Sequence, residues 1–390
     1  MRNTATRLAV VVSAVGVLFT AVACSDSNDD DASLEPGTLI SDRTITGAPA
    51  LPSADRTVLV TYTSQTAAGA RDLVSGTVAI PQGDAPDGGW PVISWAHGTV
   101  GVGDACAPSA DTVHGPSHGY LGRTSAMLDR WVAAGYAVVQ TDYEGLGTPG
   151  DHPYMNGDSA SNTVVDIVRA ARDLDPNIGT KWIAMGHSQG GHAAIYAAAR
   201  GQDRAPELDL QAVVAMAPGS RTSDVVSYFQ AGKGLDQAMR FLPILLLGAQ
   251  GARPDLDADA MLTPEALPLL TAARTGCMDD VQAAAAEAPT GGIFNPGANL
   301  QGLHDYYTGQ ELESLKLTVP TMIVQGGADQ LVFRAVTDKE VTALCGGGAD
   351  IAYRVYDGAD HRAVLERSFD DVRAYVDGVR TGEEPAGTCV

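Results

Sequence analysis

The sequence predicts an α/β fold in which a mostly parallel central sheet is flanked by helices and carries an inserted helical cap. Three observations lead to this prediction. Short, continuous apolar runs recur along the chain, which is typical of strands buried on both faces of a parallel sheet. Helix-forming stretches separate several of these runs, as in β–α–β units. One long interval lacks such runs and is rich in Ala, Leu and Pro, which indicates a helical insertion.

The strands and helices can be assigned in order along the chain. The first two predicted strands alternate polar and apolar residues, which suits antiparallel pairing, and the later ones are continuously apolar. The predicted strands are 56–62, 74–80, 91–96, 136–142, 181–186, 212–216, 321–325 and 351–356. The predicted helices between and after them are 123–134, 161–174, 189–200 and 362–379. The helical cap insertion is predicted at 221–315, over the carboxyl ends of the strands, where ligands of such sheets bind.

The sequence of the amino terminus is typical of an export signal. Arg2 and Arg7 precede an apolar stretch over 8–23, which is long enough for a secretory signal and short for a membrane span. The stretch ends at Cys24 in a sequence similar to a lipidation site, so Cys24 is predicted to be lipidated. The alternative is ordinary signal cleavage, which would leave Cys24 as a free thiol.

These features divide the chain into a signal peptide, a lipidated N-terminus with an acidic linker, and one folded domain. The predicted boundaries are 1–23, 24–50 and 51–390. The protein is therefore expected to be exported, either as a cell-envelope lipoprotein or as a secreted protein.

The charge balance is strongly acidic. The chain has 25 Lys and Arg against 47 Asp and Glu, a formal net charge of −22. Nothing in this composition would neutralise phosphates, so no nucleic-acid partner is expected. An acidic surface does not attract anionic lipid headgroups either. Any membrane tethering would therefore come through Cys24.

Four cysteines remain when Cys24 is set aside. They are Cys106, Cys277, Cys345 and Cys389. In an exported protein an even number predicts two disulfides, and three pairings are possible. No C-x-x-C or His cluster has the spacing of a metal site, so neither a metal nor another cofactor is expected.

Two pentapeptides fit the G-x-S-x-G pattern of a nucleophile elbow, a sharp turn between a strand and a helix. In 186–190 the central Ser188 follows a predicted buried strand and precedes an Ala-rich helix-forming stretch. In 115–119 the central Ser117 follows a loop sequence, and Pro116 fixes the backbone directly before it. Ser188 is therefore the predicted nucleophile, and Ser117 is predicted to be a loop serine.

A serine hydroxyl needs a base to take its proton and an acid to orient that base. Where such an elbow is found, the acid and then the histidine follow the serine in the chain. Asp329 and His361 each come directly after a predicted strand. Asp360 would point away from the adjacent His361, and Asp338 is expected to lie within a helix, too far from the strand end. The predicted triad is therefore Ser188, Asp329 and His361.

The negative charge that develops on the substrate oxygen needs backbone amides as donors. The residue after the nucleophile, Gln189, supplies one predicted donor. The loop after the strand at 91–96 supplies the other, and Thr99 is predicted to carry it. His97 is expected to hold this loop, and His187 and His192 are expected to pack around the elbow.

Taken together, these segments resemble the secretory lipase family of α/β-hydrolases, which includes fungal lipase A and actinobacterial relatives. The resemblance runs from about residue 50 to the C-terminus and is carried by the order of the short segments HGTVG, CAPS, DYEGLG, GHSQGG, GGADQLV and GADH. It implies a helical cap over the site, hydrolysis of acylglycerols and related esters, and disulfides Cys106–Cys277 and Cys345–Cys389.

The predicted function is thus a secreted serine hydrolase of acyl esters, with a small-molecule or lipid ester as substrate. A serine peptidase or acyltransferase on the same scaffold is the first alternative, because the triad does not distinguish these reactions. A non-catalytic envelope lipoprotein is the second. The most apolar run of the insertion, 240–248, either packs in the insertion's own core or lines a tunnel for the acyl chain.

Overall fold

The structure of this chain is a computed structural model that describes residues 34–232, 238–289, 291–383 and 387–389. The strands and helices in these ranges belong to the unit Glu35–Val390. The predicted signal peptide, Cys24 and the acidic run that follows it lie outside the described residues.

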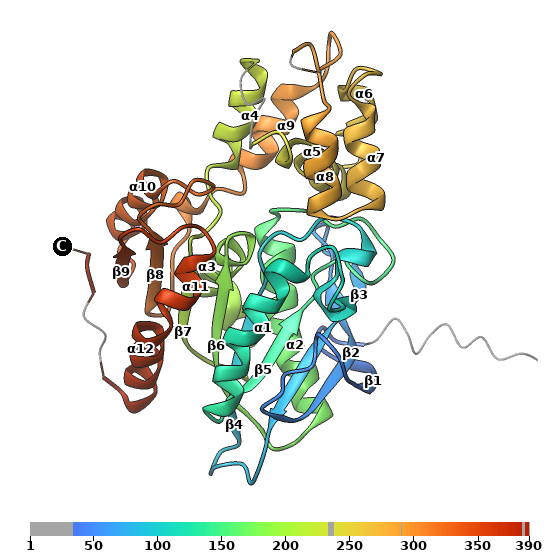
Figure 1. The fold of residues 1–390 in the computed structure, drawn as a ribbon. Helices are drawn as coiled ribbons and strands as arrows, with labels where there is room; N and C mark the ends of the chain where they lie inside the picture. The colour runs from blue at the N-terminus through green and yellow to red at the C-terminus, as the bar shows by residue number, and fades with distance from the viewer. Residues whose placement is uncertain (1–33, 233–237, 290, 384–386, 390) are drawn as a thin grey trace, which may run out of the picture. The chain divides into compact units, whose positions relative to one another are not determined.

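The centre of the fold is a sheet of parallel strands extended by antiparallel ones. Its strands in the described ranges are β1 (Leu39–Ile45), β2 (Ala54–Gln65), β3 (Arg71–Pro81), β4 (Trp90–Ala96), β5 (Ala137–Thr141), β6 (Ile178–His187), β7 (Asp209–Met216), β8 (Thr321–Gly326) and β9 (Ile351–Tyr356). They form one sheet in the order β1-β2-β3-β5-β4-β6-β7-β8-β9 (Figure 1). The pairs from β1 to β5 are antiparallel, and every pair from β5 to β9 is parallel.

Burial explains why the parallel part could be predicted. Every residue of β4 and of β8 is buried, so both faces of these strands are covered. Continuous apolar sequence is what such strands require, since each successive side chain faces one or other covered surface. The predicted mostly parallel α/β sheet is confirmed.

One strand was not predicted. Residues 39–45, within the predicted linker 24–50, form β1, which pairs antiparallel with β2 at the edge of the sheet. Backbone bonds hold β1, and most of its side chains are exposed. An edge strand of this kind has no apolar alternation, so the linker prediction is wrong for these residues.

Helices cover both faces of the sheet. Those in the described ranges are α1 (His118–Ala133), α2 (Gly157–Leu174), α3 (Gln189–Arg204), α10 (Arg334–Gly346), α11 (Ala363–Arg367) and α12 (Phe369–Thr381). The contacts of α1 with α11 and of α11 with α12 place these three on one face, and α2 packs against α3 on the other. Helix α2 begins four residues earlier than predicted because the Asn156 side chain caps it, accepting a bond from the Ser159 amide.

A group of helices lies between β7 and β8, in the interval where the insertion was predicted. These are α4 (Thr222–Gln230), α5 (Phe241–Ala252), α6 (Ala258–Met261), α7 (Leu267–Thr275), α8 (Met278–Ala286) and α9 (Leu300–Thr308), followed by the short η4 (Leu312–Ser314). Figure 1 shows them gathered at one end of the sheet. The Met278 amide donates to Val100 O (3.1 Å), and the Tyr307 hydroxyl lies 3.4 Å from Tyr154 O. The group therefore touches the loops that follow β4 and β5, at the carboxyl ends of the parallel strands.

The most apolar run of the insertion packs in the insertion's own core. On α5, Leu242, Leu245 and Leu246 are buried, in one cluster with Tyr154 and Met155 from the loop before α2. Of the two alternatives for this run, the structure favours the core. No helix in the described parts of the chain is long and apolar enough to cross a membrane.

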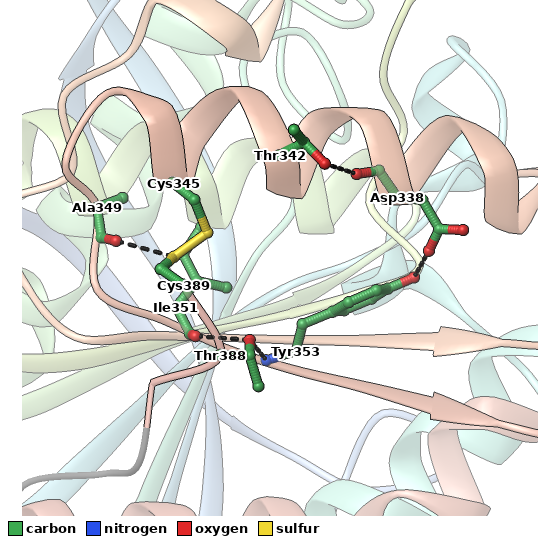
Figure 2. Close-up of a disulfide and its surroundings, with 8 residues drawn as sticks. All are labelled: Asp338, Thr342, Cys345, Ala349, Ile351, Tyr353, Thr388 and Cys389. Atoms are coloured by element: carbon green, nitrogen blue, oxygen red, sulfur yellow. Dashed lines mark hydrogen bonds between the residues drawn. A yellow bond between two sulfur atoms is a disulfide. The ribbon is translucent and has the colours of Figure 1, made fainter.

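Both disulfide pairs implied by the family resemblance are formed. Cys106, in η2 (Asp104–Cys106), is bonded to Cys277 directly before α8. Cys345, in the last turn of α10, is bonded to Cys389 (Figure 2). In the same view Thr388 lies against β9, where its hydroxyl donates to Ile351 O (2.9 Å). One disulfide thus joins the insertion to the loop after β4, and the other holds the C-terminal segment at the sheet edge.

Candidate active site

Ser188 occupies a sharp turn between β6 and α3. Its backbone angles are φ 58° and ψ −117°, a left-handed conformation that non-glycine residues rarely adopt. A Cβ added at Gly186 would lie 2.0 Å from Gly190 O, and one added at Gly190 would lie 1.8 Å from Ala96 O. Only glycine fits at these two positions, because strand and helix approach so closely there. The local geometry is that of a nucleophile elbow.

Ser117 has a different environment. It directly precedes α1, with φ −102° and no strand before it, and its hydroxyl donates to Val100 O (3.3 Å). The second sequence match therefore lies at a helix start, as a serine in a turn commonly does.

The acid and the histidine come together after neighbouring strands. Asp329 follows β8 and His361 follows β9, and the His361 Nδ1 lies 2.7 Å from an Asp329 carboxylate oxygen. Both residues are buried. Because a carboxylate only accepts, the imidazole donates through Nδ1, which leaves Nε2 unprotonated in the neutral ring and able to take a proton.

The Asp329 carboxylate is itself held in place by donors. One oxygen accepts from the Leu331 and Val332 amides (2.8 and 2.9 Å), and the other accepts from the Gln325 side chain (3.1 Å). These donors fix the direction of the Asp329 carboxylate toward His361.

The two rejected aspartates lie elsewhere. Asp360 accepts from the Arg362 and Ala363 amides (3.0 and 2.7 Å) and so caps the chain before α11. Asp338 lies within α10, as predicted, and accepts from the Tyr353 hydroxyl (2.8 Å).

The elbow and His361 are in contact through the residue before Ser188. The rings of His187 and His361 have centroids 4.6 Å apart, and His187 Nε2 lies 2.7 Å from the carbonyl oxygen of His361. The prediction that His187 only packs around the elbow was incomplete, because its ring is hydrogen-bonded. The chain thus brings the predicted serine, aspartate and histidine to one edge of the sheet, after β6, β8 and β9.

The loop after β4 carries the predicted Thr99 donor. The Gly98 amide donates to the Tyr120 hydroxyl (2.7 Å), so it is not available to a substrate. The Thr99 side chain is bonded to the Tyr154 hydroxyl (2.9 Å). Gln189 is the first residue of α3, where backbone amides have no acceptor within the helix. The assignment of the Thr99 and Gln189 amides as donors stays a prediction.

The three remaining histidines around the elbow are neutral and buried. Burial lowers the pKa of His97, His152 and His192 to about 4. His97 lies 2.8 Å from Gly98 O through Nδ1 and holds the loop, as expected. His192 is hydrogen-bonded to Gln310 O (2.8 Å), so it ties α3 to the end of the insertion.

Sequence reasoning used 142–147 only as part of the family resemblance and assigned no role in the site to the segment 142–156, between β5 and α2. His152 from this segment is bonded to the Gln189 side chain (2.9 Å between Nε2 atoms), and Tyr154 is bonded to Thr99. The segment therefore contacts the side chains of both predicted oxyanion donors. Its contacts join residues 37 and 55 positions apart, and no periodicity in a sequence indicates such pairs.

Among the described residues, no group of three or more His, Cys, Asp or Glu is arranged to hold a metal ion.

Comparison with known proteins finds a family model and solved structures that match this chain. The family model described as secretory lipase matches residues 121–368. No curated protein matches the chain. Lipase A of Candida antarctica superposes with a TM-score of 0.75 at 18% identity, over 93% of this chain and 86% of that one.

Two bacterial structures are also similar. The rice cell wall degrading esterase LipA from Xanthomonas oryzae has a TM-score of 0.70 at 16% identity, over 90% of this chain and 100% of that one. A putative hydrolase from Legionella pneumophila has a TM-score of 0.68 at 20% identity, over 86% of this chain and 98% of that one. At these identities the likeness establishes the fold alone, which is the α/β-hydrolase fold.

Proposed function

This chain belongs to the secretory lipase family, and we propose that it is an exported serine hydrolase of carboxylic esters that acts through Ser188, His361 and Asp329. The observation that carries the proposal is the buried Asp329–His361 pair, 2.7 Å apart, at the same sheet edge as the strained Ser188 turn. Membership in the family supports an ester hydrolase.

In the first half of the reaction, Ser188 Oγ bonds to the acyl carbon while His361 Nε2 takes the hydroxyl proton. Asp329 keeps Nε2 directed at the serine and stabilises the imidazolium that forms. When the tetrahedral intermediate collapses, the ester C–O bond breaks and the leaving alcohol takes the proton from His361. In the second half, water attacks the acyl-enzyme and gives its proton to His361, the acid leaves, and the proton returns to Ser188.

The amides of Gln189 and Thr99 are proposed to hold the oxyanion. Two features support this. Gln189 begins a helix, whose first amides are free to bind an anion. The amide next to Thr99, that of Gly98, is already bonded to Tyr120, which leaves Thr99 as the donor proposed for this loop.

The substrate is proposed to be a small-molecule or lipid ester. The predicted cap, 221–315, is proposed to cover the site, and the contacts of α8 and α9 with the loops after β4 and β5 support that position. Two disulfides fit an exported protein. Attachment to a membrane through lipidated Cys24 is a further proposal, and release of active enzyme into the medium on Cys24→Ala would support it.

The test compares two serines that share one motif. We expect Ser188→Ala to lose hydrolysis of p-nitrophenyl butyrate by at least about 10³-fold, because triad members act as a unit. Ser117→Ala is the matched control and should keep wild-type turnover. A dead Ser117→Ala with an active Ser188→Ala would refute the assignment.

The same protein preparations can distinguish ester hydrolysis from peptidase and acyltransferase activity. A peptide anilide tests for a peptidase, and methanol added to the ester assay tests for an acyltransferase through formation of the methyl ester. We expect ester hydrolysis to exceed anilide hydrolysis and water to be the main acyl acceptor. Faster anilide cleavage, or methyl ester as the main product in dilute methanol, would favour the other enzyme. Absence of any turnover in the wild type would favour a non-catalytic protein.

A further inference from the structure

A chain of three hydrogen bonds runs behind the proposed triad and joins the oxyanion loop to His361. The Gly98 amide donates to the Tyr120 hydroxyl (2.7 Å), that hydroxyl lies 3.1 Å from His187 Nδ1, and His187 Nε2 lies 2.7 Å from His361 O. This series of hydrogen bonds passes through four separate parts of the fold: the loop after β4, helix α1, the end of β6 and the loop after β9.

The proton positions in this chain follow from its two ends. The His361 carbonyl can only accept, so His187 Nε2 carries the hydrogen and donates it. In a neutral ring Nδ1 is then an acceptor, and the Tyr120 hydroxyl must donate to it. The Tyr120 oxygen in turn accepts from Gly98. Every donor meets an acceptor in a single arrangement, so the chain has a fixed direction.

The environment keeps this arrangement neutral. His187 is 1% exposed and Tyr120 is 6% exposed. Burial, and after it the neighbouring His361 and Arg362, hold the pKa of His187 well below its usual range. Protonation of His187 Nδ1 would leave the Tyr120 hydroxyl without this acceptor, so a lowered pKa preserves the chain at the pH of an ester assay.

The same residues are also closely packed. A Cβ added at Gly98 would lie 2.6 Å from the Tyr120 oxygen and 3.1 Å from His187 Nδ1. The Arg362 guanidinium carbon lies 5.6 Å from the centre of the Tyr120 ring, on its face. Because the contacts are this close, a shift of the loop after β4 would be transmitted to the elbow and to the backbone of His361.

We propose that Tyr120 and His187 are positioning residues that hold the oxyanion loop and the backbone of His361 at a fixed separation. This inference rests on the proposed function, since it assigns the two residues to the same reaction. Neither residue needs to touch substrate. Their role is to keep the Thr99 amide, the Ser188 turn and the His361 ring in the relative geometry that the transition state requires, where a misplacement of about 1 Å can lower turnover about 100-fold.

Four variants test the proposal. Tyr120→Phe removes the hydroxyl and leaves the Gly98 amide and His187 Nδ1 without their partner. His187→Leu removes both ring nitrogens, whereas His187→Gln keeps a donor toward His361 and an oxygen that Tyr120 can reach. Tyr136→Phe is the control, because Tyr136 is 1% exposed and its hydroxyl donates to Asp377 (3.0 Å) and accepts from Arg380 (2.9 Å), away from the site.

The readouts are kcat and KM for p-nitrophenyl butyrate, with thermal unfolding and end-point fluorophosphonate labelling to count folded, reactive molecules. We expect kcat per labelled molecule to fall at least about tenfold in Tyr120→Phe and His187→Leu, with KM within about twofold of wild type. His187→Gln should turn over at least about three times faster than His187→Leu. Tyr136→Phe should keep the wild-type kcat.

Each contrary outcome has a clear meaning. A wild-type kcat in Tyr120→Phe, or an equal loss in Tyr136→Phe, would overturn the proposal. If Tyr120→Phe does not fold, the two His187 variants decide, and equal turnover of these two would overturn it. An inactive wild type, or an active Ser188→Ala, would instead refute the proposed function.

Discussion

Glu340 offers a test in which the structure gives the sign of the effect and its order of magnitude. This residue lies on α10 with a fully buried side chain, and neither carboxyl oxygen has a hydrogen-bond partner among the described residues. Arg221 is its ion-pair partner, 3.8 Å away. Arg221 is also paired with Asp224 and Glu313, so several acids share one cation. Burial, followed by repulsion from Glu311, raises the pKa of Glu340 to about 7.

The sign follows from comparing the two states. In the unfolded chain Glu340 titrates near 4.5, so the folded protein binds this proton more tightly. The stability that the protonated acid contributes is fully present below pH 4.5 and is lost as the pH rises toward 7. Each pKa unit corresponds to about 1.4 kcal/mol, so about 3 kcal/mol is lost by pH 8.

Glu340→Gln removes this loss, because glutamine has the shape of the neutral acid and does not ionise. We expect the variant to exceed the wild type in free energy of unfolding by about 3 kcal/mol at pH 8 and by less than about 1 kcal/mol at pH 4.5. The measurement is urea unfolding at both pH values, at constant ionic strength and with the disulfides intact. Glu265→Gln, at an exposed position before α7, is the control.

The comparison isolates Glu340 because both proteins share every other titrating group. His97, His152 and His192, whose pKa values are lowered to about 4, give the opposite pH dependence in both, and the difference cancels it. An equal difference between variant and wild type at both pH values would refute the reasoning. So would a variant that is less stable at pH 8.

Three further predictions concern the site and the insertion. His361→Ala and Asp329→Ala should each lower kcat at least about 100-fold, and the double variant should lose little more than the worse single one; additive losses in the same ester assay would contradict a shared role. Cys106→Ala should lower the free energy of unfolding by about 2–5 kcal/mol in denaturant titration, since its disulfide closes a loop of 171 residues. An unchanged free energy of unfolding would show that this disulfide does not stabilise the fold. Leu246→Trp should lower the free energy of unfolding by about 1–3 kcal/mol, because the larger side chain overpacks the insertion core. Its turnover should fall equally on esters with short and with medium acyl chains. A selective loss on medium chains would instead place the acyl tunnel at α5.

The strand ends that carry the proposed triad could be predicted because each has a local sequence pattern. The elbow at Ser188 combines a buried strand, two obligatory glycines and a helix within a short stretch of chain. Asp329 and His361 each follow a continuously apolar run, and parallel strands bring their carboxyl ends to one edge. The pairing of Asp329 with His361 could then be predicted from chain order, because the acid and then the histidine follow the serine in proteins with such an elbow.

The features that could not be predicted depend on contacts between residues far apart in the sequence, or on the burial of a residue whose local sequence indicates exposure. β1 is held by backbone bonds at an edge, so its side chains carry no apolar alternation. Glu340 is a charged residue of the kind that usually faces solvent on a helix, and its burial is seen only in the folded structure. The bonds of Tyr120 to Gly98 and His187 span 22 and 67 positions, and a sequence pattern does not encode such distances.

The contacts between the insertion and the loops after β4 and β5 affect how any variant of the insertion should be interpreted. α8 is tied to the loop after β4 by the Cys106–Cys277 disulfide and by the Met278–Val100 bond, next to Thr99. The Tyr307 hydroxyl of α9 donates to Leu245 O (2.7 Å) and also lies 3.4 Å from Tyr154 O. The Tyr154 hydroxyl is in turn hydrogen-bonded to Thr99. A substitution in these helices can therefore move the proposed oxyanion donor without touching substrate. Such a change lowers kcat with little effect on KM, whereas loss of a substrate contact that is equal in ground and transition states raises KM at constant kcat.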